Sequence, residues 1–216
     1  MRIVAFIPIK LNSKRVPYKN VKQLVSGKPL MHYIQETIKG IDAIDDCYIY
    51  CSDLSIKEHI LPGISFLQRS SHLDSDTANA TDLVSSFIDL IMADIYIMVH
   101  ATSPFTKAST ICDGISKVKS GDFDSAYPVE RVQKFVWFKG MPLNYSPDLV
   151  PRTQDVEPVY IEAANPFIFT RESFLSTNSR IGNCPYMIQL GWQELIDVDT
   201  YQDFELVNTL LPLLKG

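Results

Sequence analysis

The chain has 216 residues, of which 46% are hydrophobic and 21% are charged, a balance typical of folded globular proteins. A chain of this length can bury a substantial core without disulfides or a structural metal, and it fits one domain, residues 1–216, with room for an insertion. The formal net charge of −5 excludes a broadly basic surface for nucleic acid. An anionic ligand would therefore need a local positive pocket.

The sequence carries no pattern typical of a disulfide framework, a zinc site or a membrane span. Its cysteines lack CxxC spacing, and the apolar run from Cys47 to Cys51 indicates a strand with buried free thiols. The amino-terminal apolar run is too short for a signal peptide, and no apolar stretch has the length of a membrane span. These features predict a cytoplasmic protein without a membrane partner.

Short apolar runs alternate with helical patterns through most of the chain. The expected strands are residues 3–7, 47–51, 64–67, 95–99, 125–129 and 167–169, and the expected helices begin after Pro29, near Thr81, after Ser109 and after Thr200. Strands that are apolar throughout are typical of parallel sheets buried on both faces. The pattern predicts an α/β fold with a doubly wound, mostly parallel, Rossmann-like sheet, whose ligand lies at the carboxyl ends of the strands.

Residues 128–165 break this pattern. The segment is rich in proline, carries no helical periodicity and includes the aromatic residues Phe135, Trp137 and Phe138. We expect an insertion of hairpins and loops here. Its aromatic side chains could form a small core or a surface for a partner.

The most informative stretch follows the first expected strand. Four basic residues lie within ten positions of one another, with neutral hydrogen-bonding side chains between them: Lys10, Asn12, Ser13, Lys14, Arg15, Lys19 and Asn20. A loop that leaves the first strand of such a sheet is where a polyphosphate would bind, and a nucleoside triphosphate carries about four negative charges. The loop lacks the P-loop pattern, so a solvated basic loop is an equal alternative on spacing alone.

Four segments in order resemble CMP-sialic acid synthetases and related sugar-acid cytidylyltransferases, which have a nucleotide-diphospho-sugar transferase-like fold. Residues 7–20 are similar to the opening signature of that family, which reads Pro-Ala-Arg-x-Gly/Asn-Ser-Lys-x-Leu-Pro-x-Lys-Asn. Residues 69–78, 102–105 and 196–203 resemble its later segments. The resemblance covers nearly the whole chain, and four ordered matches are more specific than any one of them.

The resemblance implies that the amino-terminal loop holds the phosphates of CTP and that a second segment holds the cytidine end. The residues in the first group are Lys10, Asn12, Ser13, Lys14, Lys19 and Asn20, and those in the second are Arg69, Thr77, Ala78 and Thr81. Within this set, Lys14 and Lys19 are the expected catalytic cations.

The resemblance also implies that Asp197 and Asp199 coordinate Mg²⁺ and complete the catalytic set. Two carboxylates at positions i and i+2 of an extended segment project to one side, and hard oxygen ligands suit Mg²⁺. The alternative is that this segment only caps the helix expected after Thr200. The interpretation requires the amino-terminal lysines and these aspartates to flank one cleft.

The resemblance places the sugar acid near His100, Lys134, Arg152 and Asn165. A sugar carboxylate favours an arginine or lysine partner. Taken alone, Lys134 could be a surface lysine, Arg152 a rim or interface arginine, and His100 the polar end of a core strand.

The implied reaction is transfer of CMP from CTP to the anomeric hydroxyl of a sialic-acid-like sugar acid, with release of pyrophosphate, by a homodimer whose insertion reaches the neighbouring subunit. Lys10, His100, Ala101 and Thr106 depart from the family pattern, which leaves the sugar more open than the nucleotide. One alternative is a sugar-phosphate nucleotidyltransferase with another base or sugar. The other is a catalytically inactive paralogue that binds a nucleotide sugar.

Overall fold

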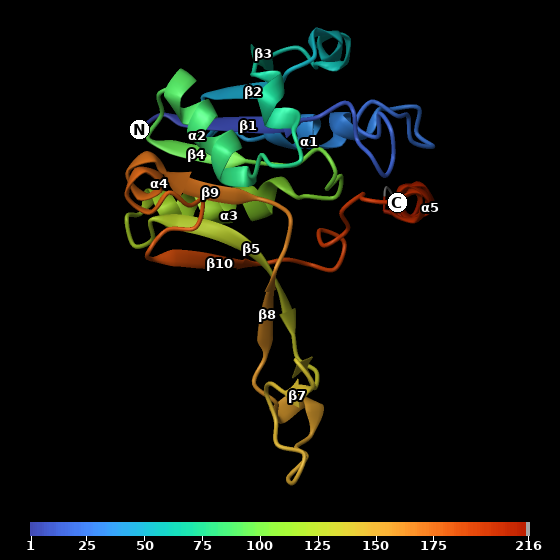
Figure 1. Cartoon of the computed structure of the whole chain (residues 1–216), viewed down its shortest axis with the longest axis vertical. Helices are drawn as coiled ribbons and strands as arrows, with labels where there is room; N and C mark the ends of the chain where they lie inside the picture. The colour runs from blue at the N-terminus through green and yellow to red at the C-terminus, as the bar shows by residue number, and fades with distance from the viewer. Residues whose placement is uncertain (215–216) are drawn as a thin grey trace.

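The structure is a computed structural model that describes residues 1–214 as one large mixed sheet with helices on both faces (Figure 1). Its strands follow the spatial order β10-β5-β9-β4-β1-β2-β3, and β8 pairs with β5 outside this path. The strands are β1 (Ile3–Ile9), β2 (Asp46–Cys51), β3 (Ser65–Gln68), β4 (Ile95–Met98), β5 (Ser125–Val132), β8 (Val159–Glu162), β9 (Phe167–Thr170) and β10 (Pro185–Gln189). The helices are α1 (Leu30–Lys39), α2 (Ala80–Leu90), α3 (Ala108–Lys119), α4 (Arg171–Thr177) and α5 (Tyr201–Leu210), with short 3₁₀ turns at Leu54–His59, Ser71–Asp74 and Thr153–Asp155.

The central strand β1 supplies side chains to both layers of the core. Ala5 and Ile7 pack in the layer that contains α1 and α3, whereas Val4 and Phe6 pack in the layer that contains α2 and α4. Successive side chains of a strand point to opposite faces, so a strand that is apolar at every position needs cover on both sides. This arrangement confirms the doubly wound α/β fold expected from the sequence.

The sheet is mixed. Strand β1 runs parallel to β2 and β4, but β9 is inserted antiparallel between β4 and β5. The antiparallel direction brings the start of β9, at Phe167, to the same edge as the carboxyl ends of β4 and β5, because Met98 pairs with Phe167. The segment that precedes β9 therefore borders the ligand edge of the sheet.

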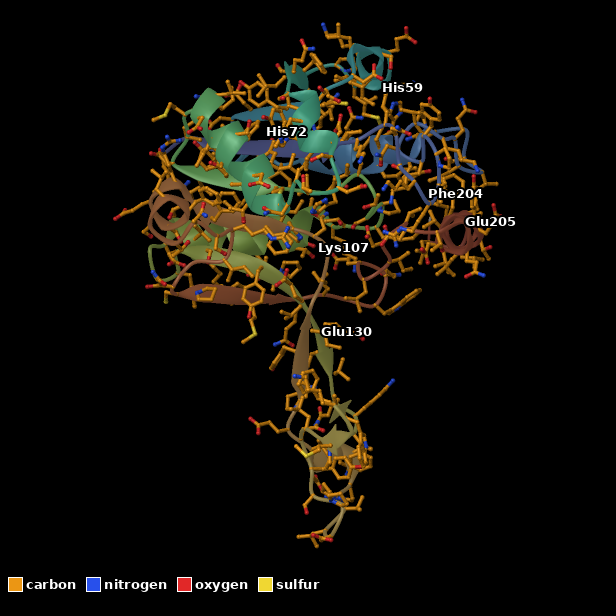
Figure 2. All side chains as sticks on the ribbon, viewed as in Figure 1. His59, His72, Lys107, Glu130, Phe204 and Glu205 are labelled. Carbon is orange, nitrogen blue, oxygen red and sulfur yellow. The ribbon has the colours of Figure 1, made fainter. Side chains whose placement is uncertain are left out.

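The insertion forms an arm that extends away from the sheet (Figure 1). Strand β5 continues past the sheet to Val132 and pairs there with β8, and Glu130 marks the start of this ribbon in Figure 2. Beyond it lies a small hairpin of β6 (Trp137–Phe138) and β7 (Met141–Pro142). The aromatic stretch around residues 135–138 thus contributes only the two-residue strand β6, which belongs to this separate two-stranded sheet.

Helix α5 packs against the start of the chain. Phe204, Val207 and Leu211 form a third apolar cluster with Leu24, Leu30 and Tyr33, and Val198 lies in the same cluster. This cluster fixes the segment that precedes α5 beside the loop that follows β1. No helix among residues 1–214 has the length and apolar character needed to cross a bilayer.

Candidate functional site

A cavity of about 390 Å³ lies at the carboxyl ends of the central strands. Its lining comes from five parts of the chain: Lys10, Ser13, Lys19 and Asn20 after β1; His100 and Thr102 after β4; Ala164 before β9; Arg180 between α4 and β10; and Asp197 and Asp199 before α5. Lys10 and Lys19 of the amino-terminal loop and the two distant aspartates thus flank one cleft, as the sequence interpretation requires, whereas Lys14 does not line it.

A larger open hollow of about 950 Å³ lies at the opposite edge of the sheet. Residues just before β1 and β4 line it, including Arg2 and Asp94, together with Arg171 at the start of α4. These polar groups already have partners, because Asp94 accepts the backbone N–H of Arg2 and Arg171 donates to the Ile88 carbonyl and the Tyr96 hydroxyl. The chemistry expected from the sequence is concentrated in the smaller cavity.

The two aspartates face this cavity because the residue between them is buried. Val198 is fully buried in the apolar cluster under α5, so its neighbours on either side project the other way. The Ser103 hydroxyl donates to Asp197 Oδ1 at 3.1 Å, and the Val198 N–H donates to the Thr102 carbonyl at 2.8 Å. The loop after β4 therefore holds the aspartate segment in place.

Lys19 joins the amino-terminal loop to the aspartate segment. Its side chain is only 13% exposed, and Nζ donates to the Val198 carbonyl at 2.6 Å and to Asp199 Oδ1 at 3.2 Å. The guanidinium of Arg15 contacts the same carboxylate oxygen at 2.8 Å. Asp199 thus lies between two cations, where it balances a strongly positive loop.

The segment after β3 packs against the same loop. Lys10 donates to the Asp74 carbonyl, and Lys14 pairs with Asp76 at the surface. The buried guanidinium of Arg69 donates to Asp74 Oδ1 at 2.5 Å and to the Ile9 carbonyl at 3.1 Å. Arg69 therefore supports the loop from the protein interior through these hydrogen bonds and does not line the cavity.

Several expected site residues do not line the cavity. Asn12, Lys14 and Thr77 are exposed outside it; Ala78 lies just before α2, and Thr81 lies in its first turn. Lys134 and Arg152 are exposed on the arm, where Arg152 pairs with Asp155 through two hydrogen bonds of 2.7 and 3.2 Å. Within one copy of the chain, the arm contributes neither of these cations to the cavity.

His100 lines the cavity, and the buried side chain of Asn165 hydrogen-bonds the backbone of His100. The Asn165 side chain, 1% exposed, accepts the His100 N–H at 3.1 Å and donates to the Thr106 hydroxyl at 2.8 Å. Asn165 therefore positions the loop after β4, and it is not among the residues that line the cavity. Burial lowers the pKa of His100 to about 4 against the opposing charge of Asp197, with Arg180 lowering it further, so the imidazole is neutral at pH 7.

Arg180 lines the cavity but was not expected from the sequence. It lies in the loop between α4 and β10, two elements that the sequence patterns also did not predict. No motif surrounds it, and its place over the Phe167 ring arises only from the folded topology. The sequence offers one weak indication of a role for Arg180, namely that it is a basic residue in a loop before a strand.

The segment that carries the aspartates also depends on a capping box at the start of α5. Asp203 accepts the backbone N–H groups of Asp199 and Thr200 at 3.0 and 2.7 Å, and the Thr200 hydroxyl accepts the Asp203 N–H. The capping alternative weighed for this segment is therefore realised by Thr200 and Asp203. It coexists with an Asp197–Asp199 pair that faces the cavity.

We expect Asp203→Ala to lower the free energy of unfolding by about 1 kcal/mol, the usual effect of losing a cap. For a chain of this size the melting temperature would fall by about 2–4 °C. Burial raises the pKa of Asp203, but hydrogen bonds from Thr200 and Asp199 outweigh it and the net direction is downward. The stabilisation is therefore present above the unfolded-chain pKa of about 3.9 and disappears as the pH falls through the lower folded value.

Thermal unfolding of the wild type and the variant at pH 7, 5 and 3.5 measures this effect. The matched control is Glu205→Ala, which removes an exposed carboxylate from the same helix (Figure 2). A loss of stability that is the same at all three pH values would contradict the role given to the ionised carboxylate.

Comparison with known proteins identifies the family of the chain. A family model described as cytidylyltransferase matches residues 4–186. The chain belongs to the cytidylyltransferase family. This membership agrees with the four ordered segments seen in the sequence.

The cytidylyltransferase is similar to several curated proteins. It is 28% identical to an N-acylneuraminate cytidylyltransferase of Streptococcus agalactiae serotype V over 94% of the chain, but it spans 52% of the length of that relative. It is 26% identical to a CMP-N,N'-diacetyllegionaminic acid synthase of Legionella pneumophila, covering 99% of the chain and 97% of the relative. A pseudaminic acid cytidylyltransferase of Campylobacter jejuni is 23% identical over 97% of the chain and 96% of its own length.

Solved structures agree on the fold. The cytidylyltransferase superposes with a TM-score of 0.74 on a CMP:2-keto-3-deoxy-manno-octonic acid synthetase complexed with CTP, at 17% identity, covering 99% of this chain and 100% of the other. It superposes with a TM-score of 0.69 on a 4-diphosphocytidyl-2C-methyl-D-erythritol synthase from Anaerococcus prevotii, at 13% identity, covering 98% and 96% of the two chains. At these identities the likeness concerns the fold alone.

Proposed function

We propose that this cytidylyltransferase transfers CMP from CTP to the anomeric hydroxyl of a sialic-acid-like, nonulosonic sugar acid and releases pyrophosphate in the cytoplasm. The observation that carries the proposal is the single cavity bordered by Lys10 and Lys19 on one side and by Asp197 and Asp199 on the other. The names of the relatives, which refer to N-acylneuraminate, diacetyllegionaminic acid and pseudaminic acid, support an acidic sugar as the acceptor.

The nucleotide is proposed to bind at the loop after β1. Lys10, Ser13, Lys19 and Asn20 line the cavity there and supply cations and hydrogen-bond donors for the triphosphate. Lys14 and Asn12, at the exposed edge of the same loop, are placed to reach a phosphate that extends outward. The segment from Arg69 to Thr81 is proposed to border the cytidine end, because Lys10 and Lys14 tie it to the loop through Asp74 and Asp76.

Asp197 and Asp199 suit Mg²⁺. Both carboxylates lie on one side of an extended segment, and the described residues contain no cluster of three or more His, Cys, Asp or Glu side chains that would form a complete protein cage. This fits Mg²⁺, which is commonly held by one or two carboxylates together with substrate phosphates. When bound, Mg²⁺ would neutralise phosphate charge and polarise the α-phosphate.

The reaction needs alignment and charge neutralisation more than a covalent nucleophile. The anomeric hydroxyl would lose its proton to solvent and its oxygen would attack the α-phosphorus in line, so that the new P–O bond forms as the bond to the β-phosphate oxygen breaks. Lys10, Lys14 and Lys19 would stabilise the charge that develops on the departing pyrophosphate. The neutral imidazole of His100 has both a donor and an acceptor nitrogen, which suits it to orient sugar hydroxyl groups.

The decisive experiment measures pyrophosphate release from CTP with Mg²⁺ and a panel of acidic sugars. We expect turnover with at least one nine-carbon acid and little with ATP, GTP or UTP. Eight-carbon acids belong in the panel, because a 3-deoxy-manno-octulosonate cytidylyltransferase of Hydrogenovibrio crunogenus is 27% identical over 133 residues, covering 61% of this chain and 53% of that relative. Absence of turnover with every acid and CTP would refute the proposal.

The arm is proposed to form a homodimer. It exposes large apolar side chains that its small hairpin cannot cover, among them Trp137, Phe138, Met141, Leu149 and Val150. Apolar surface of this kind is typical of an interaction site, and a second copy would cover it and bring Lys134 and Arg152 toward a neighbouring cavity. We take the arm, within residues 128–165, as this interface.

We therefore expect Phe138→Ser combined with Leu149→Ser to shift the protein from dimer to monomer while each copy stays folded, with the melting temperature lowered only by the loss of association. Both side chains are at least 60% exposed, so the fold of a single copy does not need them. Light scattering at several protein concentrations measures the change. The control is Leu54→Ser, which removes an exposed leucine from the turn at Leu54–His59; an unchanged mass for the arm variant would exclude this interface.

A further inference from the structure

Arg180 is a stacked guanidinium at the far end of the cavity from the basic loop. Its Cζ lies 3.5 Å from the centroid of the Phe167 ring. Phe167 begins β9, and β4 separates β9 from β1, so Arg180 is two strands away from the proposed phosphate loop. Stacking fixes the plane of a guanidinium and leaves the donors at its edge free to bind a carboxylate.

Arg180 has one hydrogen-bond partner among the described residues. Its Nη2 donates to Glu162 Oε1 at 3.0 Å, and the side chain of Glu162 is 46% exposed. Burial lowers the pKa of Arg180 and the contact with Glu162 raises it, but an arginine stays charged at neutral pH. A cation with a loosely held, solvent-facing partner is suited to exchange that partner for a ligand.

The acceptor requires such a cation close to the reaction centre. In a 2-keto sugar acid the carboxylate is bonded to the anomeric carbon, so it must lie next to the hydroxyl that attacks. The cavity residues with a fixed positive charge are Lys10, Lys19 and Arg180. Lys10 and Lys19 belong to the loop proposed for the triphosphate, so Arg180 is the cavity cation that a single subunit can offer to the acceptor.

We infer that Arg180 binds the carboxylate of the acidic sugar and that Glu162 occupies this guanidinium until the sugar displaces it. The inference rests on the proposed function and names the group that selects an acidic acceptor within one subunit. Because Glu162 belongs to β8 at the base of the arm, the exchange also releases a contact between the arm and the body of the enzyme.

The test compares Arg180→Met and Arg180→Lys with the wild type. Binding of N-acetylneuraminate and of its methyl ester is measured by calorimetry, and KM for the best acid of the panel is measured alongside. We expect the wild type to prefer the acid over the neutral ester by roughly tenfold or more, the scale of a charge-assisted hydrogen bond. Arg180→Met should lose that preference and Arg180→Lys should keep part of it, with KM for CTP unchanged.

Two further variants sharpen the test. Glu162→Gln removes the competing charge, so it should tighten acid binding by about twofold to fivefold, the range of an exposed ion pair. Arg131→Met is the matched control, because Arg131 is an exposed arginine of β5 that does not line the cavity. Melting temperatures of all variants separate a binding defect from a folding defect.

The outcomes separate this inference from the proposed function. If the wild type transfers CMP and Arg180→Met keeps both its KM for the acid and its preference over the ester, the inference is overturned and the function stands. If no acid supports pyrophosphate release but acid binding still depends on Arg180, the function falls and the inference stands. If the wild type binds no acid of the panel, both are overturned.

Discussion

Replacing Asp199 by alanine should lower turnover by roughly a hundredfold or more, the scale of losing one strong electrostatic contact at a reaction centre. Asp199 faces the cavity and lies 2.8 Å from the Arg15 guanidinium and 3.2 Å from Lys19. Its removal takes away one of two carboxylates suited to Mg²⁺ and leaves two cations without their common anion. We therefore expect a lower kcat together with weaker dependence on Mg²⁺.

The measurement is kcat and KM for CTP over a range of Mg²⁺ concentrations, together with thermal shift by CTP in the presence and absence of Mg²⁺. Asp199→Asn keeps the shape of the side chain and should show a similar defect, because the charge is the property required. Asp42→Ala removes an exposed carboxylate after α1 and serves as the control. Unchanged turnover in folded Asp199→Ala would remove the metal from this account.

The fold could be predicted from sequence wherever local and global signals agree. β1 is buried along almost its whole length, and the capping pairs Asn79–Asp82 and Thr200–Asp203 mark two helix starts, so these elements are visible as patterns. Strand β10 is not, because it is an edge strand with mostly half-exposed side chains that alternate poorly. The direction of β9 is likewise invisible, since direction depends on the path of the intervening arm.

Some residues of the candidate site could likewise be predicted from the sequence, and others could not. The loop after β1 and the aspartate pair were found because each is a compact local motif with a family counterpart. Arg180 has no local motif, and only the stacking on Phe167 brings it to the cavity. Asn165 is expected near the sugar, and in the structure its buried amide bonds the His100 N–H and the Thr106 hydroxyl behind the cavity. The spacing of residues in the sequence predicts roughly where such a residue lies in the fold. Its hydrogen-bond partners depend on side-chain packing, which spacing does not predict.

Thr106 shows how a departure from a family pattern can have a structural reason. The threonine is 4% exposed, and its hydroxyl accepts a hydrogen bond from Asn165 and donates to the Ser103 carbonyl. Ser103 in turn donates to Asp197. The residue thus belongs to a chain of hydrogen bonds that connects the segment before β9 to the aspartates, and a long cationic side chain would not fit there.

Lys19→Ala should lower kcat/KM by roughly a hundredfold or more. Lys19 is the more enclosed of the two loop cations that contact Asp199. Its partners Val198 and Asp199 lie 179 and 180 positions further along the chain. In the proposed reaction it stabilises charge on the departing pyrophosphate, so the loss should appear in kcat as well as in KM for CTP. Removing it also leaves the Val198 carbonyl without its donor, which predicts a lower melting temperature.

Lys19→Arg separates these two effects. An arginine keeps the charge and can still donate to Asp199, but it cannot occupy the narrow space of an ammonium 2.6 Å from the Val198 carbonyl without a shift. We expect it to recover stability only in part while retaining more activity than the alanine variant. The control is Lys28→Ala, whose side chain pairs with Glu36 outside the cavity. If Lys19→Ala lost stability but kept its kcat, the role of Lys19 would be to hold the two segments together. Lys10 and Lys14 would then have to stabilise the negative charge on the leaving pyrophosphate.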